Sequence, residues 1–296
     1  MIKLDDKSLK EFNIIPNKGH TNPSTPSFSE KTLEIPGKDG LYYLGVKDGV
    51  RTFTFPLTIM EKERSESQKV LREFVNLFHD SRGRKRKVKL SFDYESEKYY
   101  YVRLSSDINP TRTRAVFQFD LTLTTYDGWL YAASDAYDPK TVEEYNSGLE
   151  YGEPEAEYVN QTNTSFSNSK QYVGIYNYSH YNTPFSFMIE GYVINPRITN
   201  IATGKSVSFN LTLEAGERLY FDSKLMTVWR EKGSKFHDYW ISPTMSMKYP
   251  YEWEKFNTYD GMSGDFLELT AEENTLLFEG GDPSAHVQFE WEHRFK

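Results

Sequence analysis

Residues 51–59 read Arg-Thr-Phe-Thr-Phe-Pro-Leu-Thr-Ile, and this stretch decides the fold class of the first half of the chain. Apolar side chains stand at every second position from 53 to 59, with Thr or Pro between them. This alternation is the pattern of a strand with one buried face. Pro56 has no N–H for a ladder bond, which indicates an edge strand or a bulge. Residues 117–125, Phe-Gln-Phe-Asp-Leu-Thr-Leu-Thr-Thr, repeat the alternation and predict a second such strand.

One amphipathic helix is predicted between these strands, from Ser65 to about His79. Ser65-Glu-Ser-Gln68 fits a capping box, in which side chains satisfy free amides at the start of a helix. The apolar residues that follow form a single stripe, at positions 70, 71, 74, 75, 77 and 78. Strands are expected at 88–92 and 98–104, so the first half is predicted to be β-rich with one helix.

The second half shows short apolar stretches at close spacing from about residue 171, with turn residues between them, such as Asn195-Pro196 and Gly280-Gly281. This spacing favours an antiparallel β-sandwich. Aromatic residues make up 16% of the chain, which also favours strands. The fold class expected for the whole chain is therefore mainly β.

Charge changes sharply near residue 130. Residues 1–130 carry 22 Lys and Arg against 18 Asp and Glu, whereas residues 131–296 carry 13 against 25. The change predicts a boundary between domains at 1–132 and 166–296, joined by a polar linker at 133–165. The acidic second half argues against nucleic-acid binding, because phosphate contacts need Lys and Arg.

Several classes of protein are excluded by composition. The chain has no Cys, which excludes disulfides, thiolate metal sites and a Cys nucleophile. No apolar run approaches the roughly 20 residues that cross a bilayer. The first residues, Met-Ile-Lys-Leu-Asp-Asp-Lys, lack the apolar core of a signal peptide, so synthesis in a host cytoplasm is expected.

Catalytic motifs are also missing from the sequence. There is no G-x-S-x-G, H-E-x-x-H or P-loop pattern, and the six His are scattered. Glu252 and Glu254 could act as the carboxylate pair of a glycosidase, but a quarter of the chain is charged and such pairs arise by chance. We expect no enzyme, no cofactor and no metal site.

The basic run at residues 82–87, Arg-Gly-Arg-Lys-Arg-Lys, permits two interpretations: a nucleic-acid patch, or a solvated turn that faces anions in an assembly. The residues around 104–116 are the candidate for an extended hairpin between subunits. Arg112 and Arg114 within it are candidates for a subunit interface with acidic partners, although plain solvation explains them equally well.

Taken in order, these segments resemble the distal tail proteins (Dit) of long, non-contractile-tailed phages that infect Gram-positive bacteria. The residues that carry the resemblance are Ile35–Gly40, Arg51–Ile59, Tyr99–Leu104, Phe117–Tyr131, Gly191–Asn200, Thr203–Val207, Leu213–Asp222 and Val287–Phe295. The resemblance implies an N-terminal, tail-tube-like β-sandwich with one helix and an extended hairpin. It also implies a C-terminal β-sandwich of galectin-like or carbohydrate-module-like type.

The same resemblance implies a function. Six copies are expected to close a homohexameric ring that joins the tail tube protein to a tail-tip or tail-associated lysin protein and to a receptor-binding protein. The location implied is the tip of the virion tail. The alternative is a protein that binds host cell-wall carbohydrate through the C-terminal domain.

One segment departs from the family pattern, because residues 230–264 intervene after the strand that ends at Trp229. Nine aromatic residues lie between 229 and 259, and loops this long are usually functional or disordered. Sugar rings stack on such side chains, so the candidates for carbohydrate binding are Trp229, Tyr239, Trp240, Tyr251 and Trp253. The alternative is that these aromatics pack as a satellite core or against a neighbouring subunit.

Overall fold

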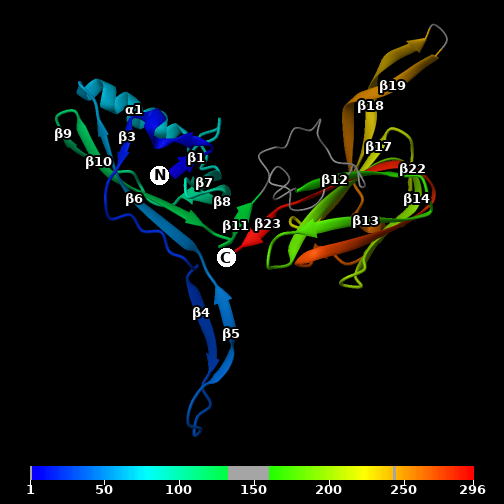
Figure 1. The fold of residues 1–296 in the computed structure, drawn as a ribbon, viewed down its shortest axis with the longest axis horizontal. Coiled ribbons are helices and arrows are strands. Elements are labelled where there is room, and N and C mark those ends of the chain that lie inside the picture. The colour runs from blue at the N-terminus through cyan, green and yellow to red at the C-terminus, as the bar shows by residue number, and fades with distance from the viewer. Residues whose placement is uncertain (1, 133–159, 243–244) are drawn as a thin grey trace. The chain divides into compact units, whose positions relative to one another are not determined.

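The computed structural model describes residues 2–132, 160–242 and 245–296, and for residues 235–242, 245–251 and 259 it describes the backbone alone (Figure 1). The chain divides into two compact units. Unit 1 comprises Met1–Ala132 with Phe295–Lys296, and unit 2 comprises Ala133–Arg294. Most of the predicted linker at 133–165 lies outside the described residues, and its last residues enter the first strand of unit 2.

Unit 1 is built on one antiparallel sheet in the order β2-β1-β7-β8-β10-β6-β3. The strands of unit 1 outside the arm described below are β1 (Ile2–Leu4), β2 (Lys7–Ser8), β3 (Ile14–Pro16), β6 (Arg51–Met60), β7 (Val88–Phe92), β8 (Glu95–Leu104), β9 (Thr111–Thr113), β10 (Val116–Thr125) and β11 (Leu130–Ala132). β6 pairs with β10 along its whole length, so the two strands predicted from alternation are confirmed as neighbours. Pro56 pairs within this ladder without a bulge, and the pairing of β3 on the other side of β6 ends at Leu57.

The core of unit 1 lies between two parts of this sheet. β8 and β10 pair only at Leu123↔Leu104 and Thr124↔Arg103, so the sheet turns there. Buried side chains from both parts meet in one cluster that includes Phe53, Leu121 and Val102. The apolar side chains that alternate along residues 51–59 therefore form the buried face of β6, as predicted.

Helix α1 (Arg64–Asn76) covers this core, together with the short 3₁₀ helix η1 (Leu9–Phe12). The predicted capping box at Ser65 is wrong, because Glu63 is the N-cap and its extended backbone precedes the helix. The Glu66 carboxylate accepts a hydrogen bond from the Glu63 N–H at 3.4 Å. A carboxylate at this position also favours the positive end of the helix. The predicted apolar stripe is correct: Leu71, Phe74 and Phe78 are buried in the core.

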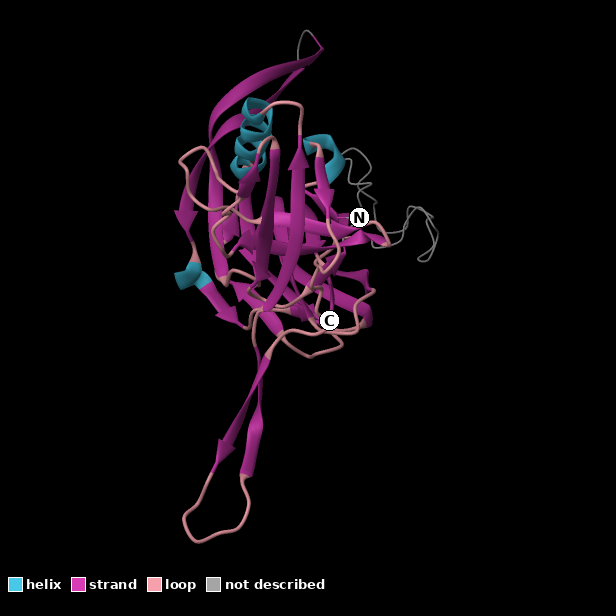
Figure 2. Ribbon diagram, turned by 90° about the vertical axis from the view of Figure 1, so that its left-hand side faces the viewer, coloured by secondary structure: helices cyan, strands magenta, loops and turns pink. Residues whose placement is uncertain are grey.

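An isolated hairpin projects from the rest of unit 1 (Figure 2). Its strands are β4 (Phe28–Leu33) and β5 (Tyr42–Asp48), and they form a two-stranded sheet of their own. We call residues 28–48 the arm. The prediction of the extended hairpin at 104–116 is wrong, because that segment holds only the three-residue strand β9 beside the start of β10. The first strand of the arm was not predicted, because the Pro, Asn and Ser residues before Phe28 are typical of a loop.

Arg51, at the first position of β6, is only 1% exposed. Its Nη1 donates a hydrogen bond to the Tyr100 hydroxyl at 2.5 Å, while Nε and Nη2 have no hydrogen-bond partner. A buried charge without a full set of partners is costly.

We predict that the double variant R51M/Y100F is more stable than the natural chain, because both buried polar groups are removed together. Its free energy of unfolding, measured by urea titration, is expected to be about 1–3 kcal/mol higher. A loss of stability in the double variant would show that the guanidinium supports the fold.

Unit 2 is an antiparallel sandwich with the strand order β12-β22-β14-β17-β18-β19. The long strands β14 and β22 each take part in both layers of the sandwich. The first half of β14 pairs with β17, and its second half pairs with β15 and β16. The first half of β22 pairs with β13, and its second half pairs with β12. The strands of unit 2 are β12 (Gln161–Phe166), β13 (Lys170–Asn177), β14 (Thr183–Asn200), β15 (Ser206–Phe209), β16 (Thr212–Leu213), β17 (Glu217–Asp222), β18 (Thr227–Ser242), β19 (Met245–Asn257), β20 (Met262–Gly264), β21 (Glu268–Leu269) and β22 (Glu272–Trp291), followed by β23 (His293–Phe295).

The prediction that Asn195-Pro196 and Gly280-Gly281 form turns between strands is wrong. Both lie inside long strands, where the pairing of β14 with β22 shifts register. At the edge of the shifted region Gly191 has φ +112°, and a Cβ there would lie 2.6 Å from the Ser284 carbonyl oxygen. Only Gly fits this position, so the bend is specified by the sequence.

The prediction of a long loop at 230–264 is also wrong. Its first part is a long hairpin in which β18 and β19 pair from Trp229↔Asn257 to Ser242↔Met245. β18 pairs with β17 only as far as Lys232. The 3₁₀ helix η2 (Tyr259–Gly261) and β20 complete the segment. Charged residues, Gly233 and Pro250 hid the strand pattern. The predicted fold class is confirmed, since strands dominate both units and α1 is the single α-helix of the described residues.

Candidate functional site

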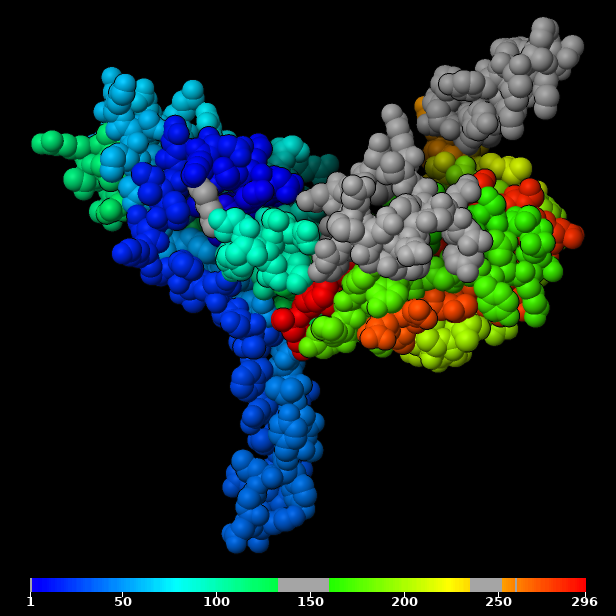
Figure 3. Space-filling model, viewed as in Figure 1, coloured from blue at the N-terminus to red at the C-terminus, as the bar shows by residue number. Residues whose placement is uncertain are grey.

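The arm exposes large apolar side chains on both of its faces. Adjacent residues of a strand point to opposite faces, and Tyr43 and Leu44 are each 63% exposed. Phe28 on β4 is 66% exposed, and every residue of β4 is exposed. In the space-filling view the arm stands clear of the rest of unit 1 (Figure 3). Exposed apolar surface of this extent marks an interaction site.

The backbone of the arm is also incompletely paired. Within the described residues β4 and β5 form strand pairs only with each other, from Phe28↔Asp48 to Leu33↔Tyr42. Each strand therefore presents one free edge. A free strand edge is a template for pairing with another chain. An isolated two-stranded hairpin is also marginal in water.

The two predicted interface arginines lie together at the short β9–β10 hairpin. Arg112 and Arg114 are both exposed, and the Arg112 guanidinium lies 5.4 Å from the centre of the Phe117 ring. Arg114 has φ +55° in the turn. Their exposure leaves both charges open to solvent or to a partner, so their role at an interface stays a prediction.

The predicted carbohydrate residues are brought together only in part. Trp229 and Trp253 are half-buried at the base of the β18–β19 hairpin. Tyr220 stacks on Trp229 with ring centres 4.9 Å apart, and the Lys255 Nζ lies 3.7 Å from the same indole. The Arg218 guanidinium lies 3.8 Å from the centre of Trp253. These contacts use ring faces that a sugar would need, so the two tryptophans are not a bare stacking platform.

The other three candidates, Tyr239, Trp240 and Tyr251, lie on strands β18 and β19. Tyr239 is paired with Met247, and Trp240 with Ser246. Their side chains lie outside the described part of the chain, so a common surface with Trp229 stays a prediction.

Sequence reasoning missed a groove on the sheet face formed by β14, β17 and β22. Ser186 lies opposite both Asp222 and Glu290, and Met188 lies opposite both Tyr220 and Gln288. The register therefore lines up Ser186, Asp222 and Glu290, polar residues that are far apart in sequence. A cavity of about 500 Å³ lies over them. Burial raises the pKa of Tyr220 above its usual value, and the nearby Glu231 carboxylate raises it further.

The sequence signal for this groove was weak. Its polar residues occupy the outward positions of ordinary alternating strands, and only the pairing of strands brings them to one place.

One comparison with known proteins matches the first unit. Residues 7–125 match the family of the phage tail protein RIFT-related domain. The match runs from β2 to β10 and includes the arm and α1. No curated protein matches the sequence.

Solved structures extend the likeness over the whole chain. The crystal structure of the Dit protein (gp 19.1) of phage SPP1, described as a paradigm of the hub adsorption apparatus in phages that infect Gram-positive bacteria, matches with a TM-score of 0.61 at 11% identity. The match covers 100% of this chain and 98% of SPP1 Dit. At this identity the likeness establishes the fold, and the resemblance to siphophage distal tail proteins is confirmed at that level.

Two baseplate structures match more loosely. The phage P2 baseplate in its activated conformation with Ca matches with a TM-score of 0.46 at 12% identity, over 95% of this chain and 90% of that one. The p2 baseplate with Sr matches with a TM-score of 0.46 at 11% identity, over 96% and 91%.

The described residues contain no group of three or more His, Asp or Glu placed to hold a metal ion. No helix among them is long and apolar enough to cross a membrane. Glu252 is exposed at the register position of Lys235, and Glu254 is exposed at that of Lys232. Opposite charges across a strand pair stabilise it modestly, which gives Glu254 opposite Lys232 a structural explanation.

Proposed function

We propose that this chain is a structural component of a phage tail tip or baseplate, and that six copies form a ring. The observation that carries the proposal is the arm, with apolar side chains exposed on both faces and two free strand edges. The match of residues 7–125 to a phage tail domain and the fold shared with SPP1 Dit support the same reading.

The physical argument for assembly is that the arm has nothing to bury in the single chain. Each large apolar side chain that becomes buried contributes about 1.5–3 kcal/mol. Neighbouring copies can cover both faces of the arm and can add a strand to its edge. A contact from the arm of one copy to a different surface of the next is heterologous, and such contacts generate closed rings when the rotation closes.

In this proposal unit 1 builds the ring and joins the tail tube protein to a tail-tip or tail-associated lysin protein. Unit 2 faces the host-adsorption proteins, including a receptor-binding protein, and the chain acts at the tip of the virion tail. The role is non-enzymatic. Arg112 and Arg114 serve the ring interface by meeting acidic side chains of a neighbouring copy.

Electron microscopy of the purified chain tests the ring directly. Negatively stained particles are expected to show closed rings with sixfold symmetry in class averages. Class averages that contain only particles the size of a single chain at micromolar concentration would contradict the proposal.

As a second candidate function, we propose that unit 2 binds a carbohydrate of the host cell wall. The observation that favours it is the polar groove on the β14–β17–β22 face, where Ser186, Asp222 and Glu290 lie side by side. Convergent polar groups of this kind fix the orientation of a bound ligand. The two functions are compatible, because they use different units.

A further inference from the structure

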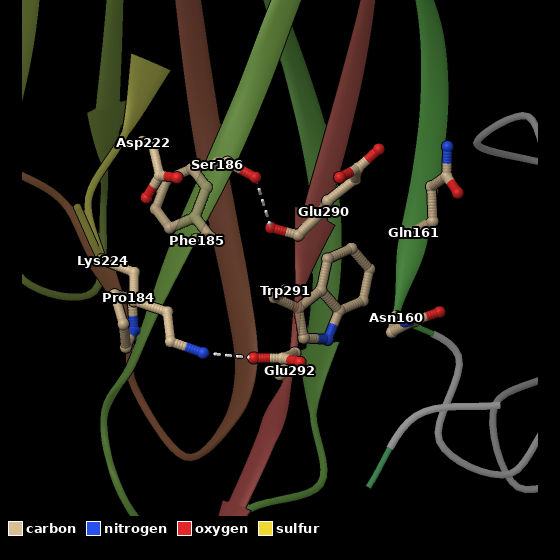
Figure 4. A pocket seen from close by; sticks show the side chains of 10 residues that line it. All are labelled: Asn160, Gln161, Pro184, Phe185, Ser186, Asp222, Lys224, Glu290, Trp291 and Glu292. Atoms are coloured by element: carbon tan, nitrogen blue, oxygen red, sulfur yellow. Dashed lines mark hydrogen bonds and ion pairs between the residues drawn. The ribbon is translucent and has the colours of Figure 1, made fainter. Parts of the chain in front are cut away.

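A second cavity of unit 2 lies at the ends of the strands that form the groove (Figure 4). Its volume is about 310 Å³. Residues of β12, β14, β17 and β22 line it, and it shares Ser186, Asp222 and Glu290 with the cavity beside Tyr220. The two cavities are therefore adjoining parts of one groove, which we call the transverse groove.

Two buried donors in the smaller cavity lack partners. Trp291 is 4% exposed and Gln161 is 7% exposed. Neither the Trp291 Nε1 nor the Gln161 Nε2 has a hydrogen-bond partner. Leaving such a group unpaired costs about 1–3 kcal/mol, and each one in a folded protein calls for an explanation. Both residues line the cavity, and their two nitrogen atoms lie just beneath its surface, so an acceptor oxygen bound there would satisfy them once the lining side chains move aside.

The remaining lining supplies acceptors and charge. Figure 4 shows the Trp291 indole between the side chains of Glu290 and Glu292. Lys224 donates to the Glu292 carboxylate across one side of the cavity. The exposed Glu290 carboxylate accepts a hydrogen bond from Gln288 and keeps further lone pairs available. The cavity thus offers unpaired donors and carboxylate acceptors within one small space.

A ligand that fits must donate and accept hydrogen bonds at neighbouring positions. Hydroxyl groups do both, so a ligand rich in hydroxyls matches the lining. An extended peptide binds by adding a strand to a sheet edge, whereas this groove crosses the face of a sheet. The groove spans four strand spacings from β12 to β18, or about 19 Å. This length suits a chain of several sugar rings.

We propose that the transverse groove binds an oligosaccharide. A sugar unit accepts from Trp291 and Gln161 and donates to Glu290 in the smaller cavity. Further units run across Ser186 and Asp222 toward Tyr220. The inference rests on the second function proposed above and is independent of the ring. It moves the main contacts away from the β18–β19 hairpin to residues of the sheet.

The test is binding of the full-length chain to a glycan array that carries neutral hexoses, N-acetylhexosamines and their oligomers. At least one oligomer is expected to be retained, and its dissociation constant is then measured by calorimetry. The variants Glu290→Gln and Tyr220→Phe are each expected to weaken it about 10-fold or more, because each removes a hydrogen bond to the ligand. Glu273→Gln is the matched control: it makes the same charge change on an exposed position of β22 outside the groove.

A second readout reports on the buried donors without a substitution in the core. In proton–nitrogen spectra the Trp291 indole N–H is expected to shift downfield on addition of the oligomer, because it gains an acceptor. Retention of no saccharide, or equal affinity in Glu290→Gln, Tyr220→Phe and the natural chain, would overturn the proposal. Particle mass is measured on the same samples, so loss of binding with rings intact separates this inference from the assembly function.

Discussion

The double substitution Tyr43→Asp and Leu44→Asp in the arm is expected to convert the ring into monomers. Both side chains are 63% exposed in the single chain and become buried at the proposed interface. Their loss removes about 3–6 kcal/mol per contact, which raises the dissociation constant of each contact about 10²–10⁴-fold. Light scattering after size-exclusion chromatography measures the change as a fall in particle mass.

A matched control uses exposed residues elsewhere. Tyr172 and Leu225 in unit 2 are 57% and 67% exposed, and Asp at both positions makes the same chemical change away from the arm. This control is expected to keep the mass of the natural particle. The stability of the folded monomer should be nearly unchanged in both variants, because exposed positions contribute little to it. Equal masses for the arm variant and the control would exclude the arm as the interface.

Phe74→Ala in α1 is expected to destabilise unit 1 by about 3–5 kcal/mol, because it opens a cavity in the core. Phe74 is fully buried, and its ring lies edge-on to Phe12 at 5.6 Å and to Phe78 at 5.4 Å. Urea unfolding followed by circular dichroism measures the loss. The two units can unfold separately, so the unit 1 transition is the one to compare.

Val75 is the comparison for Phe74. It is the next residue of the same helix and only half-buried, so Val75→Ala should cost about 1 kcal/mol. The ratio of the two effects tests which face of α1 packs on the sheet. If both variants lost the same small amount of stability, the helix would not cover the core as described.

The sequence predicted those elements whose local pattern and burial agree. Residues 51–59 and 117–125 alternate because one face of each strand packs on the core, and they pair as neighbours. The stripe of α1 was predicted for the same reason. Both ends of the helix were misplaced. It starts early because Glu63, a less common N-cap residue than Ser65, precedes it, and it ends at Asn76 rather than near His79.

The elements that could not be predicted from the sequence lack a buried face of their own. The arm is exposed on both faces, so Phe28–Leu33 shows no alternation. The β18–β19 hairpin extends beyond its pairing with β17, and its charged residues and Pro250 resemble a loop. The transverse groove depends on strand register between segments about 35 to 100 residues apart, as for Ser186 with Asp222 and Glu290. No local pattern in a single sequence reports such a juxtaposition.

The mass of the purified full-length particle in solution tests the central claim most directly. Sedimentation equilibrium over a range of concentrations is expected to give about six times the chain mass of 34.6 kDa. The arm variant is expected to give the mass of one chain in the same run. A natural chain that stays at 34.6 kDa at every concentration would contradict the proposal that this protein forms the ring of a phage tail tip.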